Sequence, residues 1–239
     1  MPQFVWNPWH GCHKYSAGCQ NCYVYRRDSS IGKDASEITK NRDFDLPIRQ
    51  ARNGSYKIPD GSTIFTCMTS DFFIEEADEW RGQLWDMIRQ RQDAAFIIIT
   101  KRIVRFKECM PANWGNGWQN VEICCTMENQ QECDRRFPIF NAIPAVRKTV
   151  ICEPLLSHIN MEDYLSSRIS RVIAGGESGN NARICDFDWI LSLRRQCLKV
   201  GVPFHFKQTG ARLRKDGRIY RILRKDQHSQ AQKANIDIF

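Results

Sequence analysis

Three cysteines near the start of the chain have the spacing of a loop that binds a metal or a cluster. Cys12, Cys19 and Cys22 form the pattern Cys-x6-Cys-x2-Cys, and Gly11 and Gly18 precede two of them. A tight turn can bring the sulfurs of a Cys-x2-Cys pair to one side, and glycine lets the backbone curl around an inorganic centre. Iron–sulfur clusters usually take four cysteines. Three therefore predict a [4Fe–4S] cluster with one iron open to another ligand, which is typical of catalysis.

Three other interpretations of this loop stay open. A structural zinc site needs four ligands, and His10 or His13 would have to supply the fourth. His13 adjoins Cys12, which makes joint tetrahedral ligation awkward, and no second Cys-x2-Cys pair exists to complete a ribbon-type site. A redox dithiol at Cys19 and Cys22 would leave Cys12 and the glycines unexplained. Cysteines placed there by chance are the third alternative.

The remaining cysteines and the N-terminus indicate a cytoplasmic protein. The 11 cysteines are an odd number, and the first residues show neither a basic patch nor an apolar run. These features argue against a disulfide framework and against a signal peptide. No stretch approaches the roughly 20 apolar residues that a membrane span needs, so we expect no membrane partner. Four of the other eight cysteines lie in apolar contexts that are typical of buried residues: Cys67, Cys124, Cys125 and Cys152.

Short apolar runs alternate with amphipathic stretches along most of the chain. Such alternation predicts parallel strands joined by helical crossovers. With a further strand at 3–6, it predicts an α/β fold, a full or partial (β/α) barrel of the TIM type, and a doubly wound open sheet is the alternative. The predicted strands are 63–67, 95–99, 121–125, 147–152, 171–174 and 203–206, and the predicted helices are 75–91, 128–143 and 186–200.

Polar residues follow the carboxyl ends of these strands, which is the face where barrel enzymes carry their chemistry. For any single residue, loop polarity or a helix cap is a sufficient explanation. Their recurrence after successive strands favours a shared site. The candidates are Asp71, Thr100, Lys101, Glu128, Glu153, Glu177 and Lys207.

The composition predicts a barrel domain over 1–210, with the cluster loop at 9–23, followed by a basic hairpin and tail over 211–239. Residues 29–62 contain few apolar residues and predict a long loop or a partly helical insertion. Asp216-Gly217 is a two-residue hairpin signal. The polar stretch 227–235 is expected to be frayed.

The charge distribution suggests a nucleic-acid partner. Lysine and arginine total 35 against 27 acidic residues, a net charge of +8. Between Ala211 and Lys225 the only acid is Asp216, and Tyr220 lies among the arginines and lysines. Such a segment can grip phosphates and stack a base. The alternatives are a generic basic surface and an edge hairpin whose charges prevent aggregation.

The cysteine loop followed by β/α units resembles the radical S-adenosylmethionine (SAM) superfamily. Its commonest spacing is Cys-x3-Cys-x2-Cys, so the longer first gap here indicates a divergent branch. More closely, the chain is similar to a phage and bacterial protein family of poorly assigned function. The motifs that carry this similarity are Trp6-Asn7-Pro8 with the cysteine loop and Tyr23, then 69–73, 100–102, 128–130, 153–156, 175–179 and 206–208.

The resemblance implies a mechanism and roles. The open iron would bind the amino and carboxylate groups of SAM, and reduction by a flavodoxin or ferredoxin would release a 5′-deoxyadenosyl radical that abstracts hydrogen from the substrate. Arg102 or Lys101 would pair with the SAM carboxylate. The implied cofactor-binding residues are Tyr23, Thr100, Lys101, Arg102, Glu128, Gly175, Gly176 and Glu177. The implied catalytic residues are Asp71, Glu153, Glu177 and Lys207.

Two classes of function therefore remain. The first is a radical SAM-type enzyme that modifies or repairs a nucleic acid or nucleotide, with a small molecule or a protein as the alternative substrate. The second is a metal-stabilised nucleic-acid-binding protein without catalytic activity. A protein that only binds nucleic acid does not need several charged side chains gathered at the mouth of a barrel, so the first class is preferred.

Overall fold

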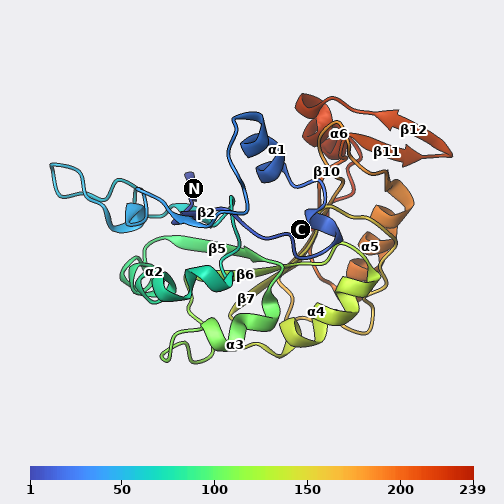
Figure 1. Ribbon diagram of the computed structural model, residues 1–239. Coiled ribbons are helices and arrows are strands. Elements are labelled where there is room, and N and C mark those ends of the chain that lie inside the picture. Colours follow the sequence, from blue (N-terminus) through green and yellow to red (C-terminus); the bar gives the residue numbers. More distant parts are fainter. The chain divides into compact units, whose positions relative to one another are not determined.

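The computed structural model describes residues 1–239, and the chain forms two compact units. Figure 1 traces the chain from its N-terminus in blue to its C-terminus in red. The cysteine loop is divided between the units, because Cys12 belongs to the first while Cys19 and Cys22 belong to the second. The first unit comprises Met1–Lys14, Val24–Cys124 and Ile143–Arg147, and the second comprises Tyr15–Tyr23, Cys125–Ala142 and Lys148–Phe239.

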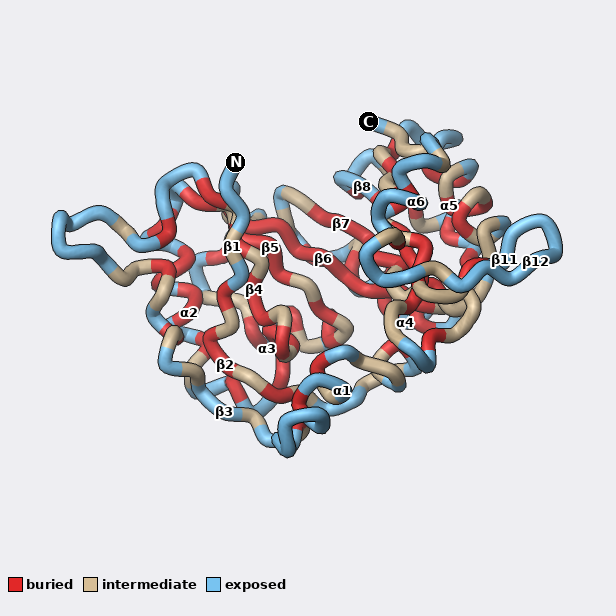
Figure 2. The backbone as a smooth tube through the Cα atoms, turned by 90° about the horizontal axis from the view of Figure 1, so that it is seen from above, coloured by how far each residue is buried: buried red, intermediate tan, exposed pale blue.

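Parallel strands form the centre of the first unit. Their order is β1 (Gln3–Trp6), β4 (Thr63–Thr66), β5 (Ala95–Thr100) and β6 (Val121–Thr126), with the last two residues of β6 in the second unit. The β1–β4 and β4–β5 pairs are parallel. Every residue of β6 is buried, and Figure 2 draws it as a red segment. Burial of every residue is typical of a strand that is covered on both faces, and in β6 it includes the polar side chains of Glu122 and Thr126.

Aromatic side chains fill the core of the first unit beside its main helix, α2 (Asp78–Gln90). The Trp85 ring lies 4.8 Å from that of Phe72 and 5.4 Å from that of Trp114, measured between centroids. Such pairs add to the stability that burial provides. The other elements of this unit are β2 (Trp9–His10), most of α1 (Tyr23–Ser30), β3 (Thr39–Lys40), α3 (Phe106–Cys109) and short 3₁₀ turns at Leu46–Ile48, Glu75–Ala77 and Ile103–Arg105.

The second unit repeats the same plan. Its parallel strands follow the order β7 (Arg147–Cys152), β8 (Arg171–Gly175) and β10 (Phe204–Gln208), with Arg147 itself in the first unit. Its longer helices are α4 (Gln130–Ala142) and α5 (Phe187–Val200). Asp186 caps α5 by accepting a hydrogen bond from the amide of Asp188, and Gly201 ends it in the left-handed conformation. Both are standard helix boundaries.

A second, three-stranded sheet of this unit contains the predicted hairpin. Its order is β12 (Arg218–Arg221), β11 (Arg212–Lys215) and β9 (Cys185–Asp186). Asp216 and Gly217 have φ values of 50° and 72°. Two consecutive positive values are what a type I′ hairpin turn requires, so the predicted turn is confirmed.

The prediction of a frayed tail at 227–235 was wrong. A 3₁₀ turn (Arg224–Asp226) leads into helix α6 (Gln227–Lys233), in which Gln227 and Ala231 are buried. The amide of Thr209 donates to the Gln227 carbonyl at 3.2 Å. Tertiary contacts therefore order a segment whose own sequence is polar.

The predicted α/β class is confirmed, because both units carry parallel strands joined by helices. Each predicted strand and helix is present, with ends that differ by a few residues. Residues 29–62 are mostly irregular, as predicted. Closure of the strands into a barrel stays a prediction. None of the helices is both long and apolar enough to cross a bilayer.

Candidate functional site

Exposure separates the three motif cysteines from the other eight. All eleven thiols are free, but only Cys12, Cys19 and Cys22 are partly exposed. Burial raises the pKa of Cys133, Cys185 and Cys197 to about 12. The thiolate is the form that ligates metals, so a deeply buried thiol with a raised pKa is a poor ligand. The thiols that an incoming iron ion can reach are therefore those of the predicted loop.

Cys19 and Cys22 lie on one tight turn of the second unit. A 3₁₀ turn covers Ala17–Cys19. The amide of Cys19 donates to the Ser16 carbonyl at 2.9 Å, and the amide of Cys22 donates to the Cys19 carbonyl at 3.3 Å. Bonds between residues three apart curl the backbone tightly. The turn that the Cys-x2-Cys spacing predicted is therefore confirmed.

Glu128 anchors this turn through hydrogen bonds from its carboxylate. Its Oε1 accepts from the amide of Gly18 at 2.9 Å and from the hydroxyl of Ser16, while its Oε2 accepts from Arg136 Nη1 at 2.8 Å. Glu128 and Arg136 are both fully buried. A Cβ atom on Gly18 would lie 3.0 Å from Oε1, so a glycine suits this close approach. Oε1 of Glu128 thus holds the loop while Oε2 pairs with Arg136, and the predicted contact of Glu128 with SAM stays a prediction.

Glu177 holds the same loop at a second point. Its Oε2 accepts from Asn21 Nδ2 at 2.9 Å and from the backbone amide of Arg183 at 2.9 Å. Arg183 also pairs with the carboxylate through its guanidinium and donates to the Ala17 carbonyl at 3.0 Å. Burial by itself would raise the pKa of Glu177, but the bonds from Arg183 and Asn21 outweigh it and hold the pKa below its usual value. Glu177 is therefore an ionised anchor beside Cys19 and Cys22.

Arg102 and Asp71 hold Cys12 in the first unit. Arg102 Nη1 lies 3.6 Å from Cys12 Sγ, and Nη2 donates to the His13 carbonyl at 2.8 Å. Asp71 lies 3.5 Å from the same guanidinium and accepts from the Thr100 hydroxyl at 2.7 Å. The structure thus brings three predicted site residues together around one predicted ligand.

Lys101 and Tyr23 have less defined places. The amide of Lys101 donates to Asp71 at 2.9 Å, and its side chain is partly exposed. Tyr23 begins α1 and is 42 % exposed, so it is not part of the core.

Glu153 and Lys207 form an ion pair in the second unit, with 2.7 Å between Lys207 Nζ and Glu153 Oε2. Gly175 and Gly176 lie nearby for a packing reason. A Cβ atom on Gly176 would lie 2.3 Å from the Thr209 carbonyl oxygen, and one on Gly175 would lie 3.2 Å from Glu153 Oε1. The close approach of the chain itself is a sufficient reason for both glycines, and their predicted contact with SAM stays a prediction.

The two histidines that would complete a zinc site have other partners. His10 Nε2 lies 2.6 Å from the buried Asp28, and His13 Nε2 lies 2.5 Å from Glu76. Within either unit by itself, no three His, Cys, Asp or Glu side chains are gathered as a metal site. The motif itself supplies one thiol from the first unit and two from the second.

Sequence reasoning missed the residues that support the loop. Their signals are weak, because a hydroxyl, an amide or an arginine at these positions has many ordinary explanations. Only the fold shows that they bind the two buried carboxylates. These residues are Ser16, Asn21, Arg136 and Arg183.

Replacement of Gly11 is expected to detach the segment that carries Cys12. Gly11 has a φ of 92°, and a Cβ atom there would lie 2.1 Å from the Glu37 carbonyl oxygen. Backbone strain and the clash together predict that Gly11→Ala lowers the free energy of unfolding by about 3 kcal/mol. Urea denaturation measures this change.

Gly32→Ala is the matched control. Gly32 also has a positive φ, 70°, but a Cβ atom there meets nothing within 4 Å. Gly32→Ala should therefore lower the free energy of unfolding only by the cost of the left-handed backbone conformation, about 1 kcal/mol. Equal losses in the two variants would refute the role of the close contact at Gly11.

Comparison with known proteins gives a family and no activity. A family described as "Protein of unknown function (DUF5131)" has a model that matches residues 2–236. A search of curated proteins returned no match. A search of solved structures also returned none.

Proposed function

Since the chain belongs to the DUF5131 family, whose description assigns no activity, we propose from its own residues that it is a radical SAM-type enzyme. Cys12, Cys19 and Cys22 would hold a [4Fe–4S] cluster. The observation that carries the proposal is the coincidence of motif and exposure. The three cysteines with cluster-like spacing are the three partly exposed thiols among eleven.

The donor set fits an iron–sulfur cluster better than zinc. Soft thiolate ligands suit such clusters, and three of them leave one iron open. The histidines that zinc would need are engaged with Asp28 and Glu76. The anchoring of the loop also supports the proposal, because a site built for chemistry needs ligands that are held in place by their surroundings.

The side chains around the loop then have separate tasks. Arg102 and Glu177 are charged groups beside the motif cysteines, so Arg102 is suited to the SAM carboxylate and Glu177 to its ammonium or ribose hydroxyls. Glu128 holds the loop and forms a fully buried ion pair with Arg136. When bound, the cluster and SAM supply the electron and the adenosyl group for hydrogen abstraction from the substrate.

Two further parts complete the proposal. The partial (β/α) barrel predicted from the sequence would enclose the site and exclude water. Glu153, Lys207 and Asp71 would contact SAM or the substrate at its mouth. A flavodoxin or ferredoxin would supply the electron.

Anaerobic reconstitution with iron and sulfide tests this function. The reduced protein should give the EPR signal of a cubane cluster, and that signal should change when SAM is added. Incubation with SAM and a reductant should then release 5′-deoxyadenosine. Stoichiometric zinc with no cluster would refute the radical mechanism and favour the metal-stabilised binding protein.

A further inference from the structure

Positive charge is concentrated in a short segment after Ala211. Residues 211–225 contain seven basic residues and one acid, so they carry six of the eight net positive charges of the chain. The segment forms β11, β12 and the turn that follows, and Figure 2 shows the end of this hairpin in the pale blue of exposed residues. A concentration of this kind attracts polyanions.

Most of these cations have no carboxylate partner. The ion pair of the segment joins Arg214 to Asp186, at 3.3 Å. Elsewhere in the chain, arginines such as Arg91 and Arg105 are paired with acidic side chains. The basic residues without an ion pair are Arg212, Lys215, Arg218, Arg221, Arg224 and Lys225.

The register of the hairpin places like charges opposite each other. Arg212 pairs with Arg221, and Lys215 pairs with Arg218. Like charges directly across two strands destabilise a sheet. Folding alone gives no reason for two such pairs in a hairpin of four residue pairs. The Lys215–Arg218 pair lies on the face of Tyr220, where a bound polyanion would turn it into a favourable contact.

Protection of an edge strand against aggregation explains the hairpin less well. Charges on an edge strand do prevent pairing with other chains. The same segment, however, exposes apolar surface at Tyr220, which is 44 % exposed, and at Leu223, which is 66 % exposed. Exposed apolar side chains oppose that purpose, and they suit a surface that stacks bases between phosphate contacts.

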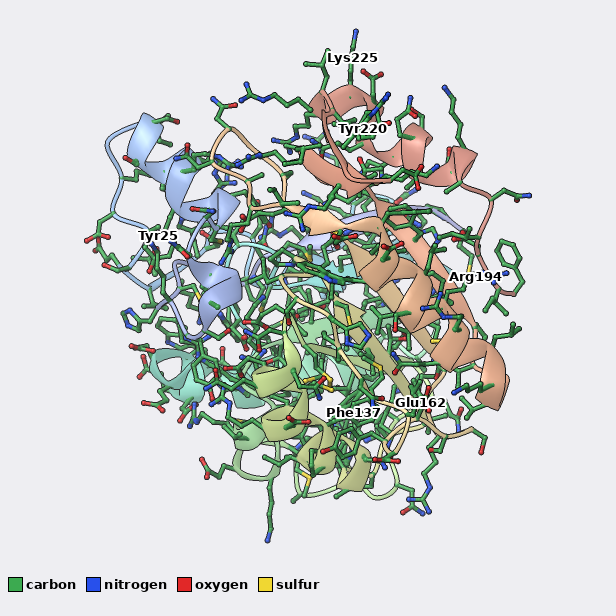
Figure 3. All side chains as sticks on the ribbon, turned by 90° about the vertical axis from the view of Figure 1, so that its right-hand side faces the viewer. Tyr25, Phe137, Glu162, Arg194, Tyr220 and Lys225 are labelled. Carbon is green, nitrogen blue, oxygen red and sulfur yellow. The ribbon has the colours of Figure 1, made fainter.

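We propose that β12 and the turn after it bind single-stranded nucleic acid. Arg218 and Tyr220 lie two positions apart and therefore on the same face of the strand. Arg218, Arg224 and Lys225 contact phosphates, Arg221 reaches them from the opposite face around the free edge of β12, and Tyr220 stacks an unpaired base. Figure 3 shows Tyr220 and Lys225 on this part of the chain, with Lys225 extending away from the ribbon. The inference does not depend on the proposed radical chemistry.

Single strands fit this surface better than a duplex. A base can stack on Tyr220 only when it is free of a pairing partner, and every base offers a face for stacking. Single-stranded DNA and RNA share this chemistry. Oligonucleotides of both kinds, together with a duplex of the same sequence, therefore belong in the test.

Fluorescence anisotropy with labelled 20-nucleotide probes tests the surface in the full-length protein. Neutralisation of the four phosphate-binding residues (R218A/R221A/R224A/K225A) should weaken binding at least tenfold and reduce the salt dependence of the affinity, because fewer counterions are released. Tyr220→Ala should weaken binding about tenfold, and Tyr220→Phe should retain it. A duplex probe should bind more weakly than either single strand.

A control variant removes the same charge elsewhere. Lys33, Arg52, Lys57 and Lys107 are exposed and lie outside the hairpin, and their joint replacement by alanine should change the affinity less than twofold. An equal loss in both quadruple variants would refute a specific surface. Unchanged binding in Tyr220→Ala would reveal a general polyanion site and overturn the assignment to nucleic acid.

Two precautions keep the outcome clear. Circular dichroism checks that each variant is folded, and R218A/R221A replaces the quadruple variant if that one unfolds. Failure of the unchanged protein to bind either single strand would overturn this inference, and it would leave the cluster proposal untouched because the assay needs neither iron nor SAM.

Discussion

Loss of any one motif cysteine should abolish the cluster. Cys12→Ala, Cys19→Ala and Cys22→Ala are each expected to fall from about four irons per chain after reconstitution to nearly none, because a cluster with only two protein ligands is poorly held. The cubane EPR signal and the release of 5′-deoxyadenosine should disappear with the iron. Iron content and EPR spectra of the reconstituted proteins measure this effect.

Cys109→Ala is the matched control for these variants. Cys109 is buried, burial raises the pKa of its thiol, and it lies outside the motif. This variant should keep the full iron content and the EPR signal of the unchanged protein. A Cys12→Ala variant that retains the cluster would show that Cys12 is not a ligand, and it would refute the three-cysteine site.

Glu128→Ala should destabilise the second unit and release the cysteine loop. The substitution removes one of the two carboxylate partners of the buried Arg136, which keeps its pair with Glu132, and it removes the acceptor for Ser16 and Gly18. Loss of one member of a buried ion pair is strongly destabilising, and because Glu132 still compensates part of the charge of Arg136, the expected loss is about 3 kcal/mol, the lower end of the usual range. Urea denaturation should show this loss, and the iron content after reconstitution should fall with it.

Two variants isolate the cause of that loss. Glu128→Gln keeps an oxygen that can accept from the loop but removes the charge, so it should retain more cluster than Glu128→Ala. Glu162→Ala is the control, because it breaks an exposed ion pair between Glu162 and Lys199. Glu162 is labelled in Figure 3. Surface pairs of this kind contribute less than about 1 kcal/mol. A Glu128→Ala variant as stable as Glu162→Ala would contradict the anchoring role.

The two carboxylates explain why a loop with so few apolar residues is ordered. Glu128 and Glu177 are both buried, and together they bind the backbone or side chains of Ser16, Gly18 and Asn21. Charged acceptors form stronger hydrogen bonds than neutral ones. Hydrogen bonds to Glu128 and Glu177, and not apolar burial, therefore fix the loop.

The elements of the fold were predictable because their signals are local. A continuous β-branched run such as 95–99 forms a buried strand largely independently of its neighbours, and the structure has it as β5. The turn at Asp216-Gly217 depends on two residues that tolerate positive φ. Helix α6 was not predictable, because its polar sequence is ordered by contacts with residues about twenty positions earlier in the chain.

The sequence by itself determined the chemistry available to this protein. Three cysteines at cluster spacing, a basic C-terminal segment and charged residues after successive strands are properties of residue type and order. The tertiary structure decided which of these groups are accessible and which are supports. Eight thiols are removed from reaction by burial, and Glu128 and Glu177 become anchors because folding brings them to a loop more than 100 residues earlier in the chain. Such long-range pairing depends on the packing of the whole unit, so no local pattern can reveal it.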